Sequence, residues 1–135
     1  HRKGATPAYG MSTAHPYGEP VVIPGAMGAA SWICLGQGNT EFLCSACHGA
    51  GRARCRGQAK ASGSELEKFL KDYPVVCSVD FTTTRRDISS KLLSSIAQEA
   101  PWMYKHIQPA IDSLADSGIA TPALKLDPIL TVKQL

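Results

Sequence analysis

The 135-residue sequence has no long apolar run and no strong excess of charge of either sign. No apolar stretch reaches the roughly 20 residues that a membrane-spanning helix needs. No segment has the pattern of a secretory signal either. The formal net charge of +3 is too small to indicate nucleic-acid binding by itself. We therefore expect no membrane association, and charge alone does not identify a partner.

Cysteine is present, but it follows no repeated spacing. The five cysteines are Cys34, Cys44, Cys47, Cys55 and Cys77. An odd number of cysteines without a repeat argues against the disulfide framework of a secreted protein. This pattern favours a reducing compartment, and we expect a cytoplasmic protein.

An initiator methionine is also missing, because the chain begins His1-Arg2-Lys3. Such a start is typical of the interior of a longer protein. The length corresponds to one modest domain. We therefore expect residues 1–135 to be the carboxy-terminal portion of a single catalytic domain, with its amino-terminal part elsewhere on the same protein or on a partner chain.

The distribution of glycine and proline predicts strands and loops in the first half of the chain and a mixed second half. Short strands are expected at 20–23 and 31–35. In Ser64-Glu65-Leu66-Glu67 the spacing of a capping box, with Ser64 as N-cap, opens an apolar stripe that predicts a helix over 64–73. The fold class is therefore α+β.

Further elements are predicted with less distinctive patterns. Residues 52–60 are expected to begin a helix, 88–96 carry a helical apolar stripe that ends before Pro101, and a helix near 109–117 stops at Gly118. Strands are expected at 75–81 and within 119–135, where Pro122 and Pro128 would interrupt them.

The run Cys44-Ser45-Ala46-Cys47-His48-Gly49-Ala50-Gly51-Arg52 is compatible with three chemistries. Cys-x-x-Cys-His can attach a c-type haem. Cys-x-x-Cys followed by spaced glycines can form half of a zinc site. His-Gly-Ala-Gly-Arg can place an imidazole nucleophile beside a glycine-rich loop whose N–H groups bind phosphate.

Each alternative makes further demands on the sequence. Haem attachment goes with export, for which no signal is visible. Zinc needs a second pair of ligands, and Cys55 has no Cys-x-x-Cys partner. The nucleophile interpretation is supported by two glycines and by Arg52, a bidentate phosphate donor. Taken alone, however, the run favours a plain glycine turn around a hydrogen-bonded histidine.

Other segments in the chain change this balance. The chain resembles the RtcB-type RNA ligases, the GTP- and manganese-dependent tRNA-splicing ligases, in motifs that follow the family order. These motifs are HRKGAT at 1–6, PGAMGAAS at 24–31, HGAGR at 48–52, APWMYK at 100–105 and Val132-Lys133. Several ordered motifs are far more specific than any one of them.

The resemblance implies an RNA ligase that joins 3′-phosphate or 2′,3′-cyclic phosphate ends to 5′-hydroxyl ends, as in tRNA splicing or RNA repair. His48 would be the nucleophile that becomes guanylylated, and His1 would be a Mn²⁺ ligand. Arg52 and Arg56 would contact phosphate of the nucleotide or RNA. The nucleotide site would be lined by His1, Arg2, Pro24, Gly25, Ala26, Met27, Ser31, His48, Gly49, Ala50, Gly51, Tyr104 and Lys133.

Departures from the family pattern leave a second hypothesis open. Ala26 stands where the family usually has Ser, and Cys55 and Gly57 stand where Ser and Thr are common. A non-catalytic relative that binds RNA or a ribonucleoprotein is therefore the alternative. Of the family's metal ligands only His1 is present, so we expect this polypeptide alone to be inactive.

Overall fold

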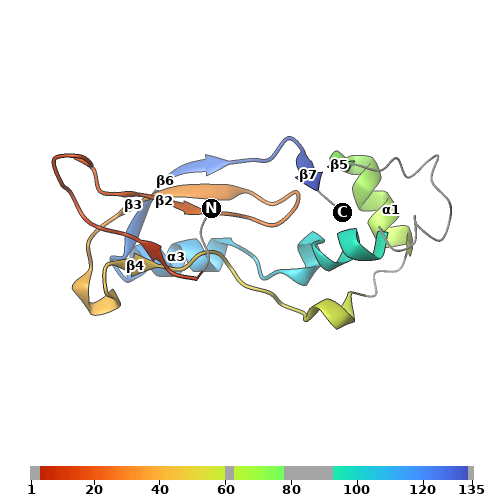
Figure 1. The fold of residues 1–135 in the computed structure, drawn as a ribbon, viewed down its shortest axis with the longest axis horizontal. Helices are drawn as coiled ribbons and strands as arrows, with labels where there is room; N and C mark the ends of the chain where they lie inside the picture. Colours follow the sequence, from red (N-terminus) through yellow and green to blue (C-terminus); the bar gives the residue numbers. More distant parts are fainter. Residues whose placement is uncertain (1–3, 60–62, 78–92, 134–135) are drawn as a thin grey trace. The chain divides into compact units, whose positions relative to one another are not determined.

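The computed structural model describes residues 4–59, 63–77 and 93–133. The chain divides into two compact units (Figure 1). The first unit comprises His1–Gly25, Ala29–Gly51 and His106–Asp127. The second comprises Ala26–Gly28, Arg52–Lys105 and Pro128–Leu135. Both contain helix and strand, which confirms the α+β class.

The first unit is built on a three-stranded antiparallel sheet in the order β2-β3-β6. These strands are β2 (Pro20–Ile23), β3 (Ser31–Gly36) and β6 (Ala120–Leu126). A two-stranded antiparallel ladder joins β1 (Thr6–Pro7) to β4 (Ser45–Ala46). The predicted strands at 20–23 and 31–35 are therefore confirmed.

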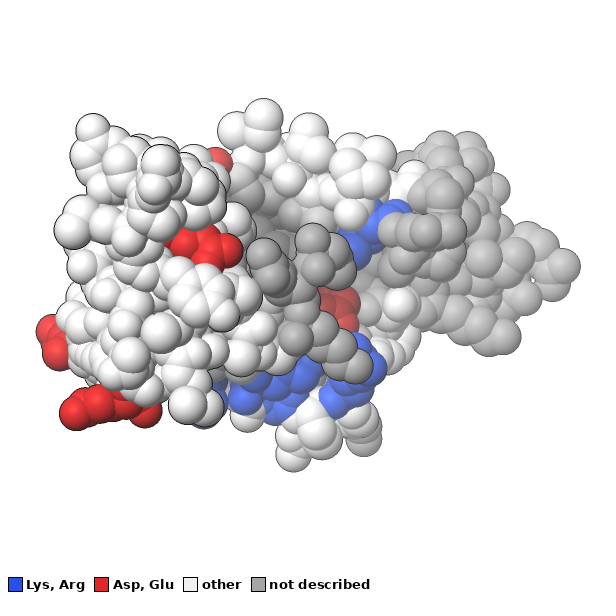
Figure 2. Space-filling model, turned by 60° about the vertical axis from the view of Figure 1, so that its left-hand side comes forward, with Lys and Arg blue, Asp and Glu red and all other residues white. Residues whose placement is uncertain are grey.

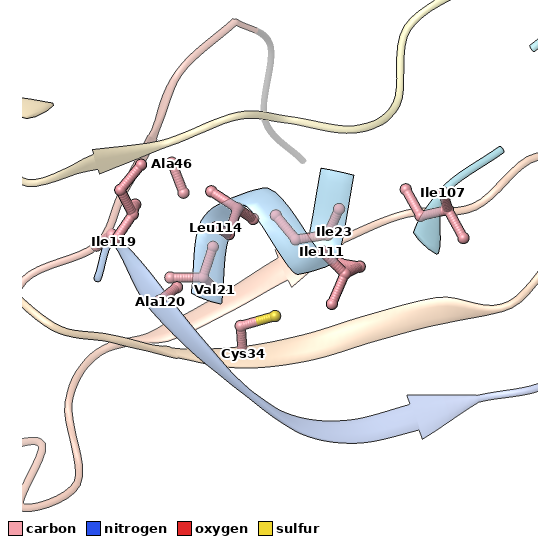
Figure 3. Packing of buried hydrophobic residues seen from close by; sticks show 10 residues of the cluster. Val21, Ile23, Cys34, Ala46, Ile107, Ile111, Leu114, Ile119 and Ala120 are labelled. Carbon is pink, nitrogen blue, oxygen red and sulfur yellow. The ribbon is translucent and has the colours of Figure 1, made fainter. Parts of the chain in front are cut away.

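One face of the three-stranded sheet forms the core of the first unit. Val21 and Ile23 alternate with exposed neighbours along β2, and Val21 lies opposite Cys34 of β3. Helix α3 (Gln108–Asp116) covers this face with Ile111 and Leu114 (Figure 3). Burying each large aliphatic side chain contributes about 1.5–3 kcal/mol. Hydrophobic burial thus fixes the sheet from which the loops of the unit extend.

Pro122 differs from expectation, because it lies inside β6 and does not interrupt it. Cys34 pairs with Pro122 whereas the preceding Ile33 pairs with Leu124, so Ala123 is the extra residue of a bulge. β6 is also an edge strand of this sheet. Proline has no backbone N–H group to donate to a neighbouring strand, and it is therefore tolerated at a bulge or on an edge strand.

The second unit has a separate core around two helical segments. Helix α1 (Gly63–Asp72) confirms the predicted helix, although it begins one residue before the expected cap Ser64. Residues 93–98 are also helical, followed by the short helix η3 (Pro101–Met103). The buried residues of this core are Met27, Leu66, Ile96, Ala97, Ala100 and Met103.

A parallel pair of strands completes the second unit. β5 (Val75–Cys77) pairs with β7 (Thr131–Lys133), so Cys77 lies opposite Lys133. The hydroxyl groups of Tyr73 and Thr131 are 3.0 Å apart and hydrogen-bonded. Aromatic packing adds to this end of α1, where Phe69 stacks on Tyr73 with ring centroids 5.4 Å apart. The tail of the chain is thereby attached to α1.

Two other expectations had different outcomes. The helix expected to begin within 52–60 is wrong for the described residues 52–59, where only a 3₁₀ turn, η2 (Arg56–Gln58), forms. The stripe at 88–96 falls largely outside the described residues, as does the strand predicted beyond Cys77. The helix predicted at 109–117 is confirmed, and Gly118 follows it with a φ of 60°. Within the described part of the chain, no helix is long and apolar enough to span a membrane.

Candidate functional site

His48 lies in the first unit, two residues after β4, in a loop that its neighbours constrain. Before β4, Leu43 and Cys44 both have positive φ, 54° and 49°, which non-glycine residues rarely adopt. Asn39 stabilises this turn: its side-chain nitrogen donates to the Ser117 carbonyl at 2.8 Å, and its backbone carbonyl accepts from Cys44 N–H. Tertiary contacts thus set the path of the chain into the histidine loop.

The imidazole of His48 is half-buried, and its Nδ1 atom is buried without a hydrogen-bond partner among the described residues. A buried polar nitrogen without a partner costs free energy unless a ligand or another group satisfies it. The plain interpretation, a histidine held by hydrogen bonds in a glycine turn, predicts a partner for this atom. The structure therefore does not support that interpretation.

The residues after His48 form a backbone that offers N–H groups. None of the N–H groups of Gly49, Ala50 and Gly51 donates to another described residue. Gly51 has a φ of 75°, a conformation that glycine adopts readily. Successive free N–H groups in such a turn are suited to bind an anion. The loop therefore has the features expected of a phosphate-binding loop next to an imidazole.

Two predicted motifs lie side by side in the first unit. A Cβ built on Gly49 would be 3.4 Å from the Pro24 carbonyl oxygen, so the histidine loop packs against the beginning of the 24–31 segment. In that segment Gly25 N–H donates to Ser31 Oγ at 3.0 Å. A Cβ on Gly25 would overlap the carbonyl oxygens of Ala29 and Ala30. Glycine is therefore required where this loop closes on itself.

The first motif also approaches the histidine loop. Thr6, the last residue of HRKGAT, pairs with Ala46 of β4, two residues before His48. Its side chain is 3% exposed, and its Oγ1 atom has no hydrogen-bond partner among the described residues. The structure thus brings together parts of three sequence motifs within the first unit.

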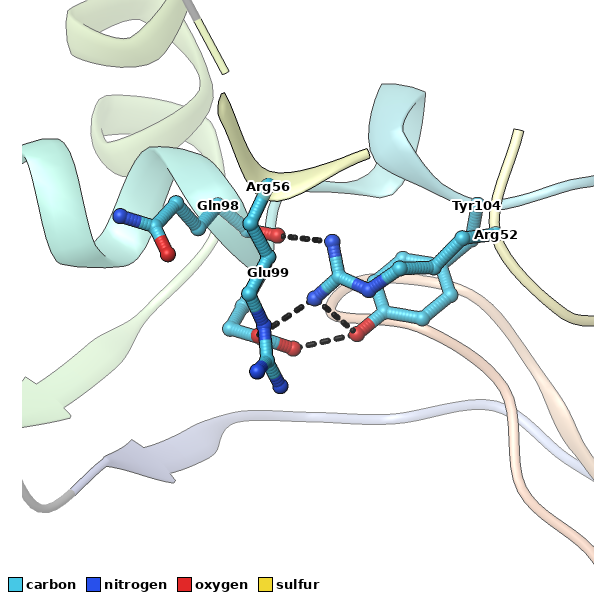
Figure 4. Close-up of polar contacts among 5 residues, drawn as sticks. All are labelled: Arg52, Arg56, Gln98, Glu99 and Tyr104. Atoms are coloured by element: carbon cyan, nitrogen blue, oxygen red, sulfur yellow. Dashed lines mark hydrogen bonds and ion pairs between the residues drawn. The ribbon is translucent and has the colours of Figure 1, made fainter. Parts of the chain in front are cut away.

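In the second unit, Arg52 and Tyr104 belong to one polar cluster (Figure 4). The guanidinium carbon of Arg52 is 4.7 Å from the centroid of the Tyr104 ring, and Nη2 donates to the Tyr104 hydroxyl at 3.0 Å. Glu99 binds both residues: its Oε1 accepts from Arg52 Nη2 at 2.5 Å, and its Oε2 accepts from the Tyr104 hydroxyl. We call Arg52, Glu99 and Tyr104 the Glu99 cluster.

Arg56 lies at the edge of this cluster. Its Nε atom is 3.9 Å from Glu99 Oε1, and its side chain is 72% exposed. Figure 2 shows most Lys and Arg side chains of the face that it draws in one band, with a second group apart from it. An exposed arginine in a long ion pair can turn to a phosphate at little cost.

Comparison with known proteins agrees with the motifs. A family model described as tRNA-splicing ligase RtcB matches residues 1–134. The chain belongs to the RtcB family. The tRNA-splicing ligase RtcB of Methanopyrus kandleri (strain AV19) is 32% identical to it in an alignment that covers 98% of this chain and 14% of that relative. The chain thus spans about one seventh of the length of that relative.

The remaining residues expected from the RtcB resemblance lie in the second unit or outside the described part. Met27 is 5% exposed, and its side chain packs in the core of the second unit. Lys133 is half-buried on β7, beside Cys77. Burial raises the pKa of the Cys77 thiol, and the charge of Lys133 partly offsets this rise. His1 and Arg2 lie outside the described residues.

The metal-binding alternatives gain no support from the described residues. Among them, no group of three or more His, Cys, Asp or Glu side chains could hold a metal ion. Cys44 is half-buried in the turn before β4, and Cys47 is exposed. A zinc or haem site built on Cys44 and Cys47 would need ligands from outside this part of the chain.

Sequence reasoning missed Glu99. It directly precedes the APWMYK motif, but nothing in the local pattern distinguishes it from other surface carboxylates. Its carboxylate contacts Arg52, 47 positions earlier in the chain. Only the folded chain reveals that contact.

Proposed function

We propose that this chain contributes the guanylate-accepting part of an RNA ligase, with His48 as the nucleophile. The observation that carries the proposal is that, among the described residues, neither Nδ1 of His48 nor the N–H groups of the adjacent glycine loop have a hydrogen-bond partner. Membership of the RtcB family supports the same assignment. Because the chain covers only a small part of its relative, the activity is proposed for the full-length protein that carries this sequence.

In the proposed first step, a neutral ring nitrogen of His48 attacks the α-phosphorus of GTP. A nitrogen–phosphorus bond forms while the bond to the bridging oxygen breaks, pyrophosphate leaves, and the ring proton passes to solvent. The N–H groups of Gly49, Ala50 and Gly51 would donate to the oxygens that gain charge. The product is a histidine–GMP phosphoramidate.

In the proposed second stage, the guanylate passes to an RNA 3′-phosphate, and a 5′-hydroxyl then attacks to seal the strand with release of GMP. The substrates would be tRNA halves or broken RNA with 3′-phosphate ends, or with 2′,3′-cyclic phosphate ends that water first opens to the 3′-phosphate. Arg52 and Arg56 are predicted to bind phosphate. Of these two arginines, Arg56 has the more exposed side chain. Phosphate contacts of this kind orient RNA without reading its sequence.

The cofactor requirements follow from the resemblance and remain partly outside this chain. Mn²⁺ would neutralise triphosphate oxygens, and His1 would supply one imidazole ligand to it. One imidazole does not hold Mn²⁺ against water with useful affinity. We therefore expect the 135-residue chain alone to leave GTP unreacted, and the other ligands to come from the amino-terminal part of the protein or a partner chain.

The test is covalent labelling of the full-length protein with GTP labelled at the α-phosphate, in the presence of Mn²⁺. We expect an acid-labile label that is lost in His48→Ala and retained in His106→Ala. His106 is exposed and serves as the matched control. Label that persists in His48→Ala would refute the assignment. If the full-length protein without substitutions acquires no label but binds RNA in a salt-dependent manner, the non-catalytic alternative is favoured.

A further inference from the structure

The carboxylate of Glu99 connects Tyr104, which the RtcB resemblance places in the nucleotide site, with Arg52, which the resemblance assigns to phosphate of the nucleotide or RNA. We propose that Glu99 is a positioning residue that holds Tyr104 and Arg52 in the arrangement that binds the guanine nucleotide. The inference rests on the proposed function, and it assigns a role to a residue that the motifs do not single out.

The geometry of the carboxylate carries the proposal. Each oxygen of Glu99 has a different partner: Oε1 accepts from Arg52 Nη2, and Oε2 accepts from the Tyr104 hydroxyl. The same Nη2 atom also donates to the Tyr104 hydroxyl, so the three groups form a closed triangle (Figure 4). Removing one partner would leave the other two with unmatched polar atoms.

The backbone around the triangle is fixed independently of the side chains. Arg52 and Tyr104 form an isolated antiparallel bridge, and Ala53 N–H donates to the Met103 carbonyl at 2.9 Å. Met103 and Ala100 are fully buried in the second core. Glu99 is therefore attached to a rigid part of the unit, and its carboxylate can restrict the motion of its two partners.

The hydrogen bonds of Arg52 suggest different tasks for the two arginines. Toward described residues, Arg52 uses three of its five N–H donors, one toward the Gln98 carbonyl at 2.7 Å and two within the triangle. Its side chain is 24% exposed, against 72% for Arg56. Arg52 thus mainly orients Tyr104, and Arg56 is the arginine with greater freedom to meet phosphate.

The test measures the rate of GTP labelling as a function of GTP concentration in the full-length protein. The variants are Glu99→Gln, Tyr104→Phe and the double variant, with Glu67→Gln as control. Glu67 lies exposed on α1, so the same chemical change there should have no effect. Glu99→Gln and Tyr104→Phe should each raise the half-saturating GTP concentration about tenfold or more, since each loses a charge-assisted hydrogen bond.

Coupling between the variants separates positioning from general stability. Because Glu99 acts through Tyr104, the double variant should be little worse than either single variant. Glu99→Asp keeps the charge and should recover part of the affinity. Two results would overturn the inference. In the first, Glu99→Gln leaves the half-saturating GTP concentration unchanged and only lowers the fraction of molecules that become labelled. In the second, the increases caused by Glu99→Gln and Tyr104→Phe multiply in the double variant.

A second readout needs no catalysis. Arginine side-chain NMR should show restricted rotation of the Arg52 guanidinium in the parent protein and faster rotation in Glu99→Gln. Equal rotation in both proteins would contradict the positioning role. If the parent protein does not label at all, the proposed function fails and the role of Glu99 in nucleotide binding fails with it. If the parent labels and Glu99→Gln binds GTP equally well, only the present inference fails.

Discussion

Cys34 and Cys47 illustrate how burial separates two thiols on one chain. Cys34 is fully buried on β3, whereas Cys47 is exposed in the loop before His48. Burial raises the pKa of the Cys34 thiol, and the nearby Cys47 raises it further. Because the thiolate is the reactive form, the two residues should differ strongly in reactivity.

We expect iodoacetamide at neutral pH to modify Cys47 and Cys55 well before Cys34. Both of the faster residues are exposed. The measurement is a time course of alkylation followed by peptide mass spectrometry, with the unfolded protein as the control in which all cysteines react. Modification of Cys34 as fast as Cys47 in the folded protein would show that the β3 core is open to solvent.

The phenol of Tyr104 gives a pH-dependent prediction. Burial raises the pKa of Tyr104 above its ordinary value of 10.0, and the hydrogen bond to Glu99 and the charge of Glu99 raise it further. Between the ordinary and the raised pKa, the unfolded chain binds fewer protons than the folded one, so stability falls as pH rises. Below about pH 10 the phenol is protonated in both states and contributes no pH dependence.

The free energy of unfolding should therefore decrease from about pH 10 upward, and the decrease should be smaller in Tyr104→Phe. Denaturant unfolding between pH 8 and 11 measures this difference. Cys34 and Cys77 titrate in the same direction, but they contribute equally to both proteins. An identical decrease in the two proteins would mean that Tyr104 titrates as if it were exposed.

At the scale of elements, the loop from Pro24 to Ser31 depends on glycine at position 25. A methyl group on Gly25 would overlap two backbone carbonyl oxygens of the same loop. We expect Gly25→Ala to lower the free energy of unfolding by about 1–3 kcal/mol. The matched control is Gly57→Ala, where an added Cβ has no atom within 4 Å. Thermal unfolding of both variants measures the difference. Equal stability of Gly25→Ala and Gly57→Ala would contradict the close contacts of Gly25 in this loop.

Helix α3 gives a second prediction at this scale. Ile111 of α3 faces the three-stranded sheet and is 1% exposed. Ile111→Ala should therefore lower the free energy of unfolding by about 2–5 kcal/mol. The control Ser113→Ala changes an exposed position of the same helix. Hydrogen exchange should increase mainly within the first unit, which holds this core. Uniform acceleration over both units would instead indicate that they unfold together.

Elements with a clear period could be predicted from the sequence. Leu66, Phe69 and Leu70 recur at helical spacing, and the helix at 63–72 buries that face. The short apolar run at 20–23 predicts a strand, and alternation along 31–35 predicts the next one, because a half-buried strand repeats every two residues. Local patterns of this kind need no knowledge of distant residues.

Other elements depended on contacts that the local sequence does not contain. Pro122 lies in β6 because a bulge on an edge strand accommodates it. Residues 52–59 extend from a bridge with Tyr104 and do not continue as a helix. For the site, contiguous motifs indicated His48 and its loop, but the Glu99 cluster joins residues about 50 positions apart. Such pairs become visible only in the folded chain.

At the scale of the whole molecule, the two units each supply a different part of the proposed chemistry. The first holds His48 with its glycine loop, and the second holds the Glu99 cluster and Lys133. The metal ligands other than His1 are expected from outside this sequence. Each activity measurement should therefore use the full-length protein.

The decisive measurement of the role of His48 is to incubate the full-length protein with GTP and Mn²⁺ and to locate the guanylate by tandem mass spectrometry. Digestion at neutral or alkaline pH preserves an acid-labile phosphoramidate. If His48 accepts the guanylate, the modification lies on His48, in the peptide that contains Gly49 to Gly51. A guanylate found on a lysine or on another histidine, with His48 unmodified, would contradict it.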